Sequence, residues 1–294
     1  MFLRPSVGIW PVVGYTGQIM NSKNPPRKSV ISKFKAGPIA PLTEAMRLFQ
    51  TGKIKPAEKL VEKFIKANPG HPDALHLMGL ILFNQGQAVK SANYIAKAIA
   101  AGGESNPAFQ ANHGLALKTA GKLPESLIAY NKALAIDATN PGWWNDRGNV
   151  LSQQGLLAEA EGSYRRSLEL TSRDAKTWVN LGSVLVKQGK FSEAIASTRK
   201  AVEISPQMAQ THNGLGNALH LSGKVPEAIN SFETALKLDA QYGEAIGNLA
   251  VCFEEINKID KARDLIEKSR LKLKDNAHLA LVLAKCDRRD GNLE

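Results

Sequence analysis

The chain has 294 residues, of which 43% are hydrophobic and 22% charged, and its formal net charge at pH 7 is +11. This composition is that of a folded soluble protein, and no segment approaches the ~18 consecutive apolar residues of a membrane-spanning helix. Two cysteines, Cys252 and Cys286, are too few for a disulfide framework or a metal site. We expect buried, unpaired thiols and a cytoplasmic protein, with a disulfide between the two as the alternative.

Residues 1–37 form a leader that carries six Lys/Arg and no acidic residue, and its prolines and glycines leave no helical period. We expect it to be disordered. A secretory signal is the alternative, although the short apolar run Val7–Val13 is interrupted by Pro11. Translation could also begin at Met20. Residues 38–71 add six basic and three acidic residues, so most of the net charge lies in these two segments and does not indicate a nucleic-acid-binding face.

From Pro38 onward the sequence repeats with a 34-residue period. Leu181-Gly182 recurs as Leu215-Gly216, and Glu193-Ala194-Ile195 recurs as Glu227-Ala228-Ile229. A period of this length is typical of a helix–turn–helix unit that buries its apolar face by stacking on its neighbours. The expected repeats are 38–71, 72–106, 107–140, 141–174, 175–208, 209–242 and 243–276, followed by a partial repeat, 277–294.

Two series of small residues follow this period. We expect the first to end the first helix of each repeat in a left-handed conformation, which glycine and asparagine tolerate. Its members are Gly52, Gly86, Gly121, Gly155, Gly189, Gly223, Asn257 and Gly291. The second lies inside the first helix, where glycine costs ~1 kcal/mol relative to alanine, and it predicts close contact between helices. Its members are Gly79, Gly114, Gly148, Gly182 and Gly216, continued by Ala250 and Ala284.

These patterns resemble the tetratricopeptide repeat, whose signature is W-x2-LG-x2-Y…A-x3-F…P. One repeat has Trp178-x2-Leu181-Gly182-x2-Leu185, then Ala194-x3-Thr198 and Pro206. The resemblance covers residues 38–294 and implies an all-α fold, a right-handed α-solenoid of stacked 34-residue repeats. Departures from the signature are His113 and Arg147 at a leucine position, Thr198 at an aromatic position and His212 at the tryptophan position. We expect Trp144, at that same tryptophan position, to lie in the core, and Trp143 to pack on the preceding helix.

No catalytic motif or metal-ligand spacing is present, so we expect neither enzymatic activity in this chain nor a cofactor. The resemblance implies that the first helices line a concave groove that binds a partner protein or an extended peptide. A row of amides in such a groove can bond a peptide backbone of any sequence, as in the similar asparagine ladder of O-linked N-acetylglucosamine transferases. The alternative is that the amides bond neighbouring helices or water. The candidate groove residues are Asn112, Asn145, Asp146, Asn149, Asn180, Lys187, Asn213, Asn217, His220 and Asn248.

The sequence favours a non-catalytic interaction protein with a protein or peptide ligand, and we expect neither a nucleic acid nor a membrane as partner. The alternative is the substrate-recruiting arm of a longer transferase. His71–Gly86 resembles the opening repeat of bacterial arrays that precede a sulfotransferase or a glycosyltransferase. The first helix expected in 277–294 lacks its partner helix, so we expect this end to pack on another domain or on a second copy, and a self-associating scaffold is a third interpretation.

Overall fold

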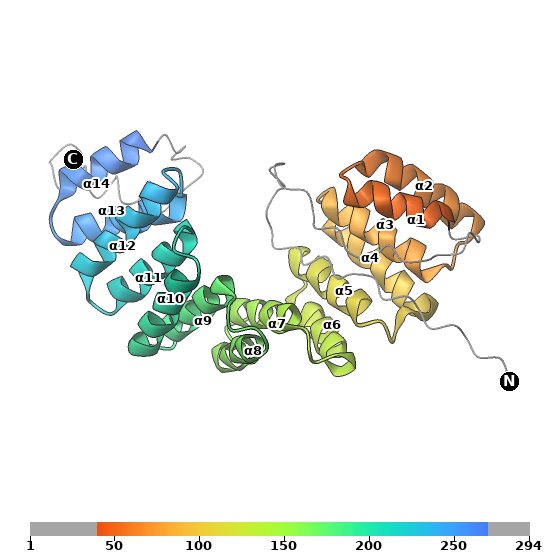
Figure 1. The fold of residues 1–294 in the computed structure, drawn as a ribbon, viewed down its shortest axis with the longest axis horizontal. Helices are drawn as coiled ribbons and strands as arrows, with labels where there is room; N and C mark the ends of the chain where they lie inside the picture. The colour runs from red at the N-terminus through yellow and green to blue at the C-terminus, as the bar shows by residue number, and fades with distance from the viewer. Residues whose placement is uncertain (1–39, 270–294) are drawn as a thin grey trace, which may run out of the picture. The chain divides into compact units, whose positions relative to one another are not determined.

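The computed structural model describes residues 40–269, and between these limits the chain is helical and contains no β-strand (Figure 1). The expected leader, 1–37, and the partial repeat, 277–294, therefore lie outside the described residues. The helices are α1 (Ala40–Gln50), α2 (Ile54–Ala67), α3 (Pro72–Asn84), α4 (Ala88–Ala98), α5 (Pro107–Thr119), α6 (Leu123–Ile136), α7 (Pro141–Gln153), α8 (Leu157–Leu170), α9 (Ala175–Lys187), α10 (Phe191–Ile204), α11 (Ala209–Leu221), α12 (Val225–Leu238), α13 (Gly243–Glu255) and α14 (Ile259–Lys268), with a π-helical turn, η1 (Ile99–Gly103).

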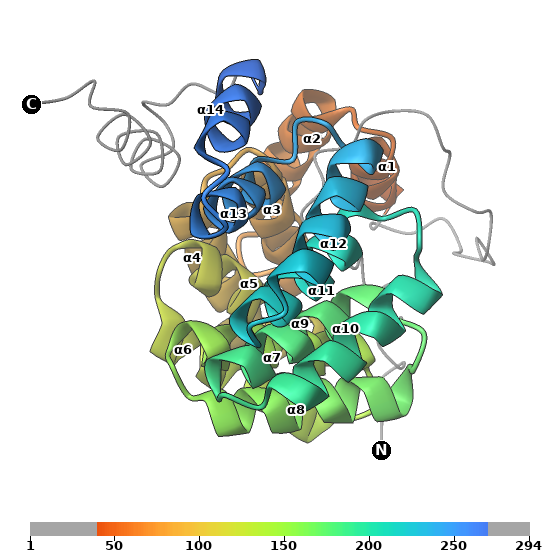
Figure 2. The ribbon, with the colours of Figure 1, turned by 90° about the vertical axis from the view of Figure 1, so that its left-hand side faces the viewer.

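The described chain divides into two compact units, unit 1 up to Asp146 and unit 2 from Arg147, and the boundary lies within α7. Each unit consists of helix hairpins in which an odd-numbered helix, here called an A helix, contacts the following even-numbered B helix (Figures 1 and 2). Within each unit a B helix also contacts a following A helix, as α4 contacts α5 in unit 1 and α10 contacts α11 in unit 2. The all-α repeat architecture predicted from the sequence is confirmed.

The helix boundaries follow the sequence period. The A helices α7, α9, α11 and α13 begin at Pro141, Ala175, Ala209 and Gly243, a constant 34-residue step. The predicted left-handed ends are confirmed by positive φ angles in every A-helix turn of the described chain. These residues are Gly52, Gly86, Gly121, Gly155, Gly189, Gly223 and Asn257. Asn257, with φ of 58°, is the one non-glycine residue with positive φ that is found between residues 40 and 269.

The second glycine series marks a close approach of the two helices in the hairpins from α3 to α12. A Cβ atom added at Gly114 would lie 2.9 Å from the ring of Tyr130, and one added at Gly216 would lie 2.6 Å from the ring of Phe232. At Gly182 the nearest atom is the Thr198 methyl carbon, at 2.5 Å. The contacting B-helix residue always follows the glycine by 16 positions, so the predicted close contact between helices is confirmed.

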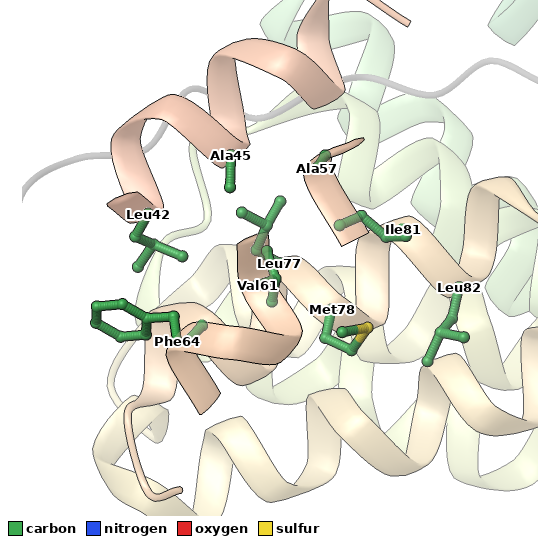
Figure 3. Close-up of a cluster of buried hydrophobic side chains, with 10 residues drawn as sticks. Leu42, Ala45, Ala57, Val61, Phe64, Leu77, Met78, Ile81 and Leu82 are labelled. Atoms are coloured by element: carbon green, nitrogen blue, oxygen red, sulfur yellow. The ribbon is translucent and has the colours of Figure 1, made fainter. Parts of the chain in front are cut away.

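The core of unit 1 shows how the hairpins stack. Leu42 on α1, Val61 on α2 and Leu77 on α3 are each at most 1% exposed and belong to one cluster (Figure 3). Full burial of one such side chain contributes about 1.5–3 kcal/mol. Because these three side chains come from three successive helices, the hairpin of α1 and α2 buries its apolar face only by packing on the next repeat.

One repeat is a residue longer than the others, and the structure accommodates the extra residue locally. The A helices α3 and α5 begin at Pro72 and Pro107, a 35-residue step in place of the usual 34-residue one. Between them α4 continues into the π-helical turn η1, in which Gly102 has φ of 112°. Gly102 is therefore outside the helical conformation, and η1 contains a kink between two helical segments. The insertion is therefore absorbed at the end of α4, and the helices that follow keep the regular spacing.

The side chains at the tryptophan position, Trp144, Trp178 and His212, each place a ring nitrogen within hydrogen-bonding distance of a backbone carbonyl six residues earlier. Trp144 Nε1 donates to the Ala138 carbonyl at 2.9 Å, and Trp178 Nε1 donates to the Ser172 carbonyl at 2.8 Å. His212 Nε2 lies 2.9 Å from the carbonyl oxygen of Pro206, six residues earlier as in the other two pairs. The expectation that Trp144 lies in the core is wrong: it is half-buried, with its ring nitrogen bonded to the preceding loop, and the neighbouring Trp143 is buried instead.

None of the helices between residues 40 and 269 is long and apolar enough to cross a membrane.

Candidate functional site

The candidate residues all lie on A helices. In unit 2, Asn180 and Asn213 lie on α9 and α11, and each is bonded to an amide on a neighbouring A helix. We call this side of unit 2 the A-helix face. It carries Asn149, Asn180, Lys187, Asn213, Asn217, His220 and Asn248. In unit 1, Asn112 lies on α5, and the half-buried Asn145 and Asp146 lie on the first part of α7.

Two of the unit 2 amides form a bridge between α7 and α9. Asn180 Nδ2 donates to Asn149 Oδ1 at 3.2 Å, and the hydroxyl of Tyr164 on α8 donates to the same oxygen at 2.8 Å. The Asn149 oxygen is therefore saturated by two protein donors, whereas its Nδ2 makes no hydrogen bond with a described residue. Of the two roles expected for the amides, this pair performs the bonding of neighbouring helices and leaves one donor free.

A second amide bridge joins α11 and α13. Asn248 Nδ2 donates to Asn213 Oδ1 at 3.1 Å. Asn213 Nδ2 in turn lies 3.4 Å from a carboxylate oxygen of Glu244 and 3.5 Å from the hydroxyl of Tyr242. Asn213 is 8% exposed, so this side chain is held by the fold on both of its polar atoms. The Tyr242 hydroxyl donates to Glu244 at 3.0 Å, and burial, with a contribution from this carboxylate, raises the pKa of Tyr242.

The remaining candidates on the A-helix face differ in their bonding. His220 Nε2 lies 3.0 Å from a carboxylate oxygen of Glu255, so this pair links α11 to α13 as the second amide bridge does. Lys187 is exposed and Asn217 is half-buried, and neither makes a hydrogen bond or ion pair with residues 40–269. Lys187 and Asn217 are therefore the candidates on this face whose polar groups are all left available to a ligand by the described residues.

In unit 1 the candidate Asn112 is engaged by a histidine that the sequence did not single out. Asn112 Nδ2 donates to His76 Nε2 at 3.1 Å, and the His76 ring stacks on Phe109 with centroids 4.0 Å apart. Burial of the ring lowers the pKa of His76 from 6.5 to about 3. The neutral form fits this geometry, because a protonated ring would place a second donor against the amide nitrogen. The sequence could have indicated a buried histidine here, because His76 lies within the apolar run of α3.

Two buried tyrosines, Tyr130 and Tyr164, occupy the same position in successive repeats and give a matched test of the hydrogen bond to Asn149. Tyr164 bonds Asn149, whereas the buried hydroxyl of Tyr130 has no partner, because Leu115 occupies the position of Asn149 one repeat earlier. We expect Tyr164→Phe to lower the free energy of unfolding by about 1 kcal/mol, and Tyr130→Phe to leave it unchanged or raise it by a few tenths of a kcal/mol. Urea unfolding of both variants measures the difference, and equal losses would contradict the assignment of the bond.

No cluster of three or more histidine, cysteine, aspartate or glutamate side chains placed to hold a metal ion occurs between residues 40 and 269. Cys252 is buried within α13, and burial raises the pKa of its thiol to about 12. The chemistry that the described residues offer on the A-helix face is therefore hydrogen bonding by amides and charge pairing by Lys187 and the α13 carboxylates.

Comparison with protein families returned models of the tetratricopeptide repeat. They match residues 42–107, 114–155, 182–223 and 219–286. A comparison with curated proteins gave no match.

Solved structures with the same fold are similar over most of the described chain. A tetratricopeptide repeat protein from Parabacteroides merdae aligns with a TM-score of 0.70 at 15% identity, over 84% of this chain and 98% of that one. The APC/C heterotetramer Cut9-Hcn1 aligns with a TM-score of 0.61 at 17% identity, over 73% of this chain, which spans only 42% of the matched chain. MamA aligns with a TM-score of 0.51 at 20% identity, over 56% of this chain and 95% of MamA. At these identities the likeness concerns the fold.

Proposed function

This chain belongs to the tetratricopeptide repeat family, and from that membership we propose that it is a non-catalytic protein–protein interaction scaffold that holds an extended segment of a partner along the A-helix face of unit 2. Stacked repeats suit this role because each adds one further pair of helices to a continuous surface. One structural relative, Cut9-Hcn1, is a hetero-tetramer, which is consistent with a role in assembly.

The row of polar groups that remains available on the A-helix face carries the proposal. Asn149 retains a free donor, Nδ2, and Asn248 retains a free acceptor, Oδ1, after their bonds to neighbouring helices are counted. Asn217 offers both. An extended peptide presents one donor and one acceptor per residue, so such a row can bond its backbone with little regard to its sequence.

Charge on the same face supports a preferred orientation of the ligand. Lys187 on α9 is exposed and unpaired with any described residue, while α13 carries Glu244 and Glu255, both exposed. A bound segment with an acidic residue near α9 and a basic residue near α13 would complement both charges. Such pairs at the rim of an interface change the association rate and the salt dependence more than the affinity.

The test uses random 12-residue peptides displayed on phage and selected on the full chain. The affinity of the recovered peptides is then measured by fluorescence anisotropy for two double variants. We expect Lys187→Ala with Asn217→Ala to weaken binding at least tenfold. The matched control, Lys237→Ala with Asn230→Ala, changes the same residue types on the B helix α12 and should bind as the wild type does. Equal affinities for the two double variants would refute binding on the A-helix face.

A second role, recruitment of a substrate for a transferase domain of a longer protein, is supported by the resemblance of His71–Gly86 to the opening repeat of arrays that precede sulfotransferases or glycosyltransferases. The mass of the native gene product tests it. A product much longer than 294 residues with a transferase domain is the expected result, and a product of this length would exclude the role. Either role is consistent with a cytoplasmic protein.

A further inference from the structure

A separate groove lies on the B-helix side of unit 1, between α4 and α6, with α5 below it. Its volume is about 340 Å³. Its lining residues come from α4, α5, α6 and the turn before α6, and they include Val89, His113, Lys122, Glu125, Ile128 and Lys132. None of the candidate residues on A helices lines this groove, so it is distinct from the surface of the proposed function.

The rims of this groove carry unusual apolar exposure. Val89 on α4 is 55% exposed and Ile128 on α6 is 56% exposed. These are the two largest exposed fractions among the large hydrophobic side chains of the described residues, and both line the groove. Singly exposed hydrophobic residues are ordinary, but two that face one hollow from opposite helices are typical of a docking surface.

The charged residues around the groove favour an acidic occupant. Lys122 and Lys132 line it, and neither makes an ion pair with a described residue. One carboxylate, Glu125, accompanies these two cations, and it too lacks an ion-pair partner between residues 40 and 269. The groove therefore carries one excess positive charge. The basic leader, 1–37, has the same sign of charge and is not complementary to it.

Gln110 and His113, both on α5, make the floor of the groove polar. His113 stands at a phase of the 34-residue period that is occupied by Arg147 in the next repeat and by leucine in the three after it, at positions 181, 215 and 249. Burial lowers the pKa of His113, and the charge of Lys132 lowers it further. The positive potential at the floor would be offset by a carboxylate placed between the imidazole and the lysine, whereas leucine in place of His113 would provide no such preference.

We propose that this groove docks an acidic, apolar segment of a partner protein, with aliphatic side chains between Val89 and Ile128 and a carboxylate directed to His113, Lys122 and Lys132. The segment would bind independently of a peptide on the A-helix face. One chain could thereby hold two partner segments at once and join them in one assembly.

The test selects phage-displayed random 12-residue peptides on the full chain and discards those that still bind Ile128→Ser. Ile128 is more than half exposed, so this variant should fold, and its thermal melt checks that it does. The peptides that remain should carry a net negative charge and aliphatic residues. Their affinity should fall at least tenfold for Lys122→Ala with Lys132→Ala, and should not change for Lys187→Ala with Asn217→Ala, which tests the proposed function separately.

The matched control is Ile136→Ser, which removes an exposed isoleucine from the same helix outside the groove and should leave binding unchanged. Three results would overturn the proposal. They are the absence of any peptide that distinguishes Ile128→Ser from the wild type, the recovery of neutral or basic peptides, and a dimer in light scattering that Ile128→Ser dissociates, which would make a second copy the occupant.

Discussion

Replacement of Gly216 by leucine is expected to lower the free energy of unfolding by about 3 kcal/mol. The reason is steric, because the first added carbon alone would lie 2.6 to 2.9 Å from three ring carbons of Phe232 on the facing helix α12. Phe232 is fully buried and cannot move aside without displacing its own neighbours. Chemical unfolding monitored by circular dichroism measures the loss.

The same substitution at Gly162 provides the control. Gly162 lies within α8, is exposed, and would have no atom within 4 Å of an added Cβ. Because leucine is the better helix former, we expect Gly162→Leu to raise the free energy of unfolding by up to about 1 kcal/mol. A loss of similar size at both positions would show that the register of helix contacts described for the glycine series is wrong.

The second large effect concerns pH and His76. The pKa of this histidine is about 3 in the fold against 6.5 as its ordinary value, so between these pH values the unfolded chain binds the additional proton. The stability contributed by the neutral ring is therefore complete above pH 6.5 and is lost progressively as the pH falls toward 3. Between pH 7 and pH 5 this residue alone should remove about 2 kcal/mol from the free energy of unfolding.

Two variants without a titratable group at this position, His76→Gln and His76→Leu, test that expectation. Each should be less stable than the wild type at pH 7, since stacking on Phe109 or the bond to Asn112 is lost. The difference should narrow by about 2 kcal/mol at pH 5, because only the wild type loses stability through this group. Urea unfolding at both pH values measures it. If the difference in the free energy of unfolding between the wild type and the variants were the same at pH 7 and pH 5, the assignment of His76 as a buried neutral histidine would be wrong.

The regular parts of this fold could be predicted because each follows one repeating physical requirement. A left-handed helix end needs glycine or asparagine, and the 34-residue period therefore located Asn257 as well as the glycines. The close helix contacts were likewise predictable, because a glycine inside a helix has a cost that close packing explains. The 35 residues between Gly86 and Gly121 can be read from the sequence, but only the structure shows that the extra residue is accommodated at Ile99–Gly103.

The side-chain pairings were not predictable, because the partner atoms come from positions that the period does not constrain. Asn112 and Asn180 stand at equivalent positions, yet one bonds His76 and the other bonds Asn149. Whether an amide on an A helix serves the fold or a ligand depends on one neighbouring residue, such as the tyrosine on α8 or the glutamate on α13.

The amide bridges of unit 2 also bear on how stiff the stack of repeats is. Each bridge is a side-chain hydrogen bond between successive A helices, and a small change in the angle between those helices would lengthen this hydrogen bond. A ligand that accepts the hydrogen bond of Asn180 in place of Asn149 would remove the bridge between α7 and α9. A ligand that bonds both side chains would replace this direct hydrogen bond with a longer link through the ligand. Under the proposed function, binding on this face and the stiffness of unit 2 would depend on the same few hydrogen bonds.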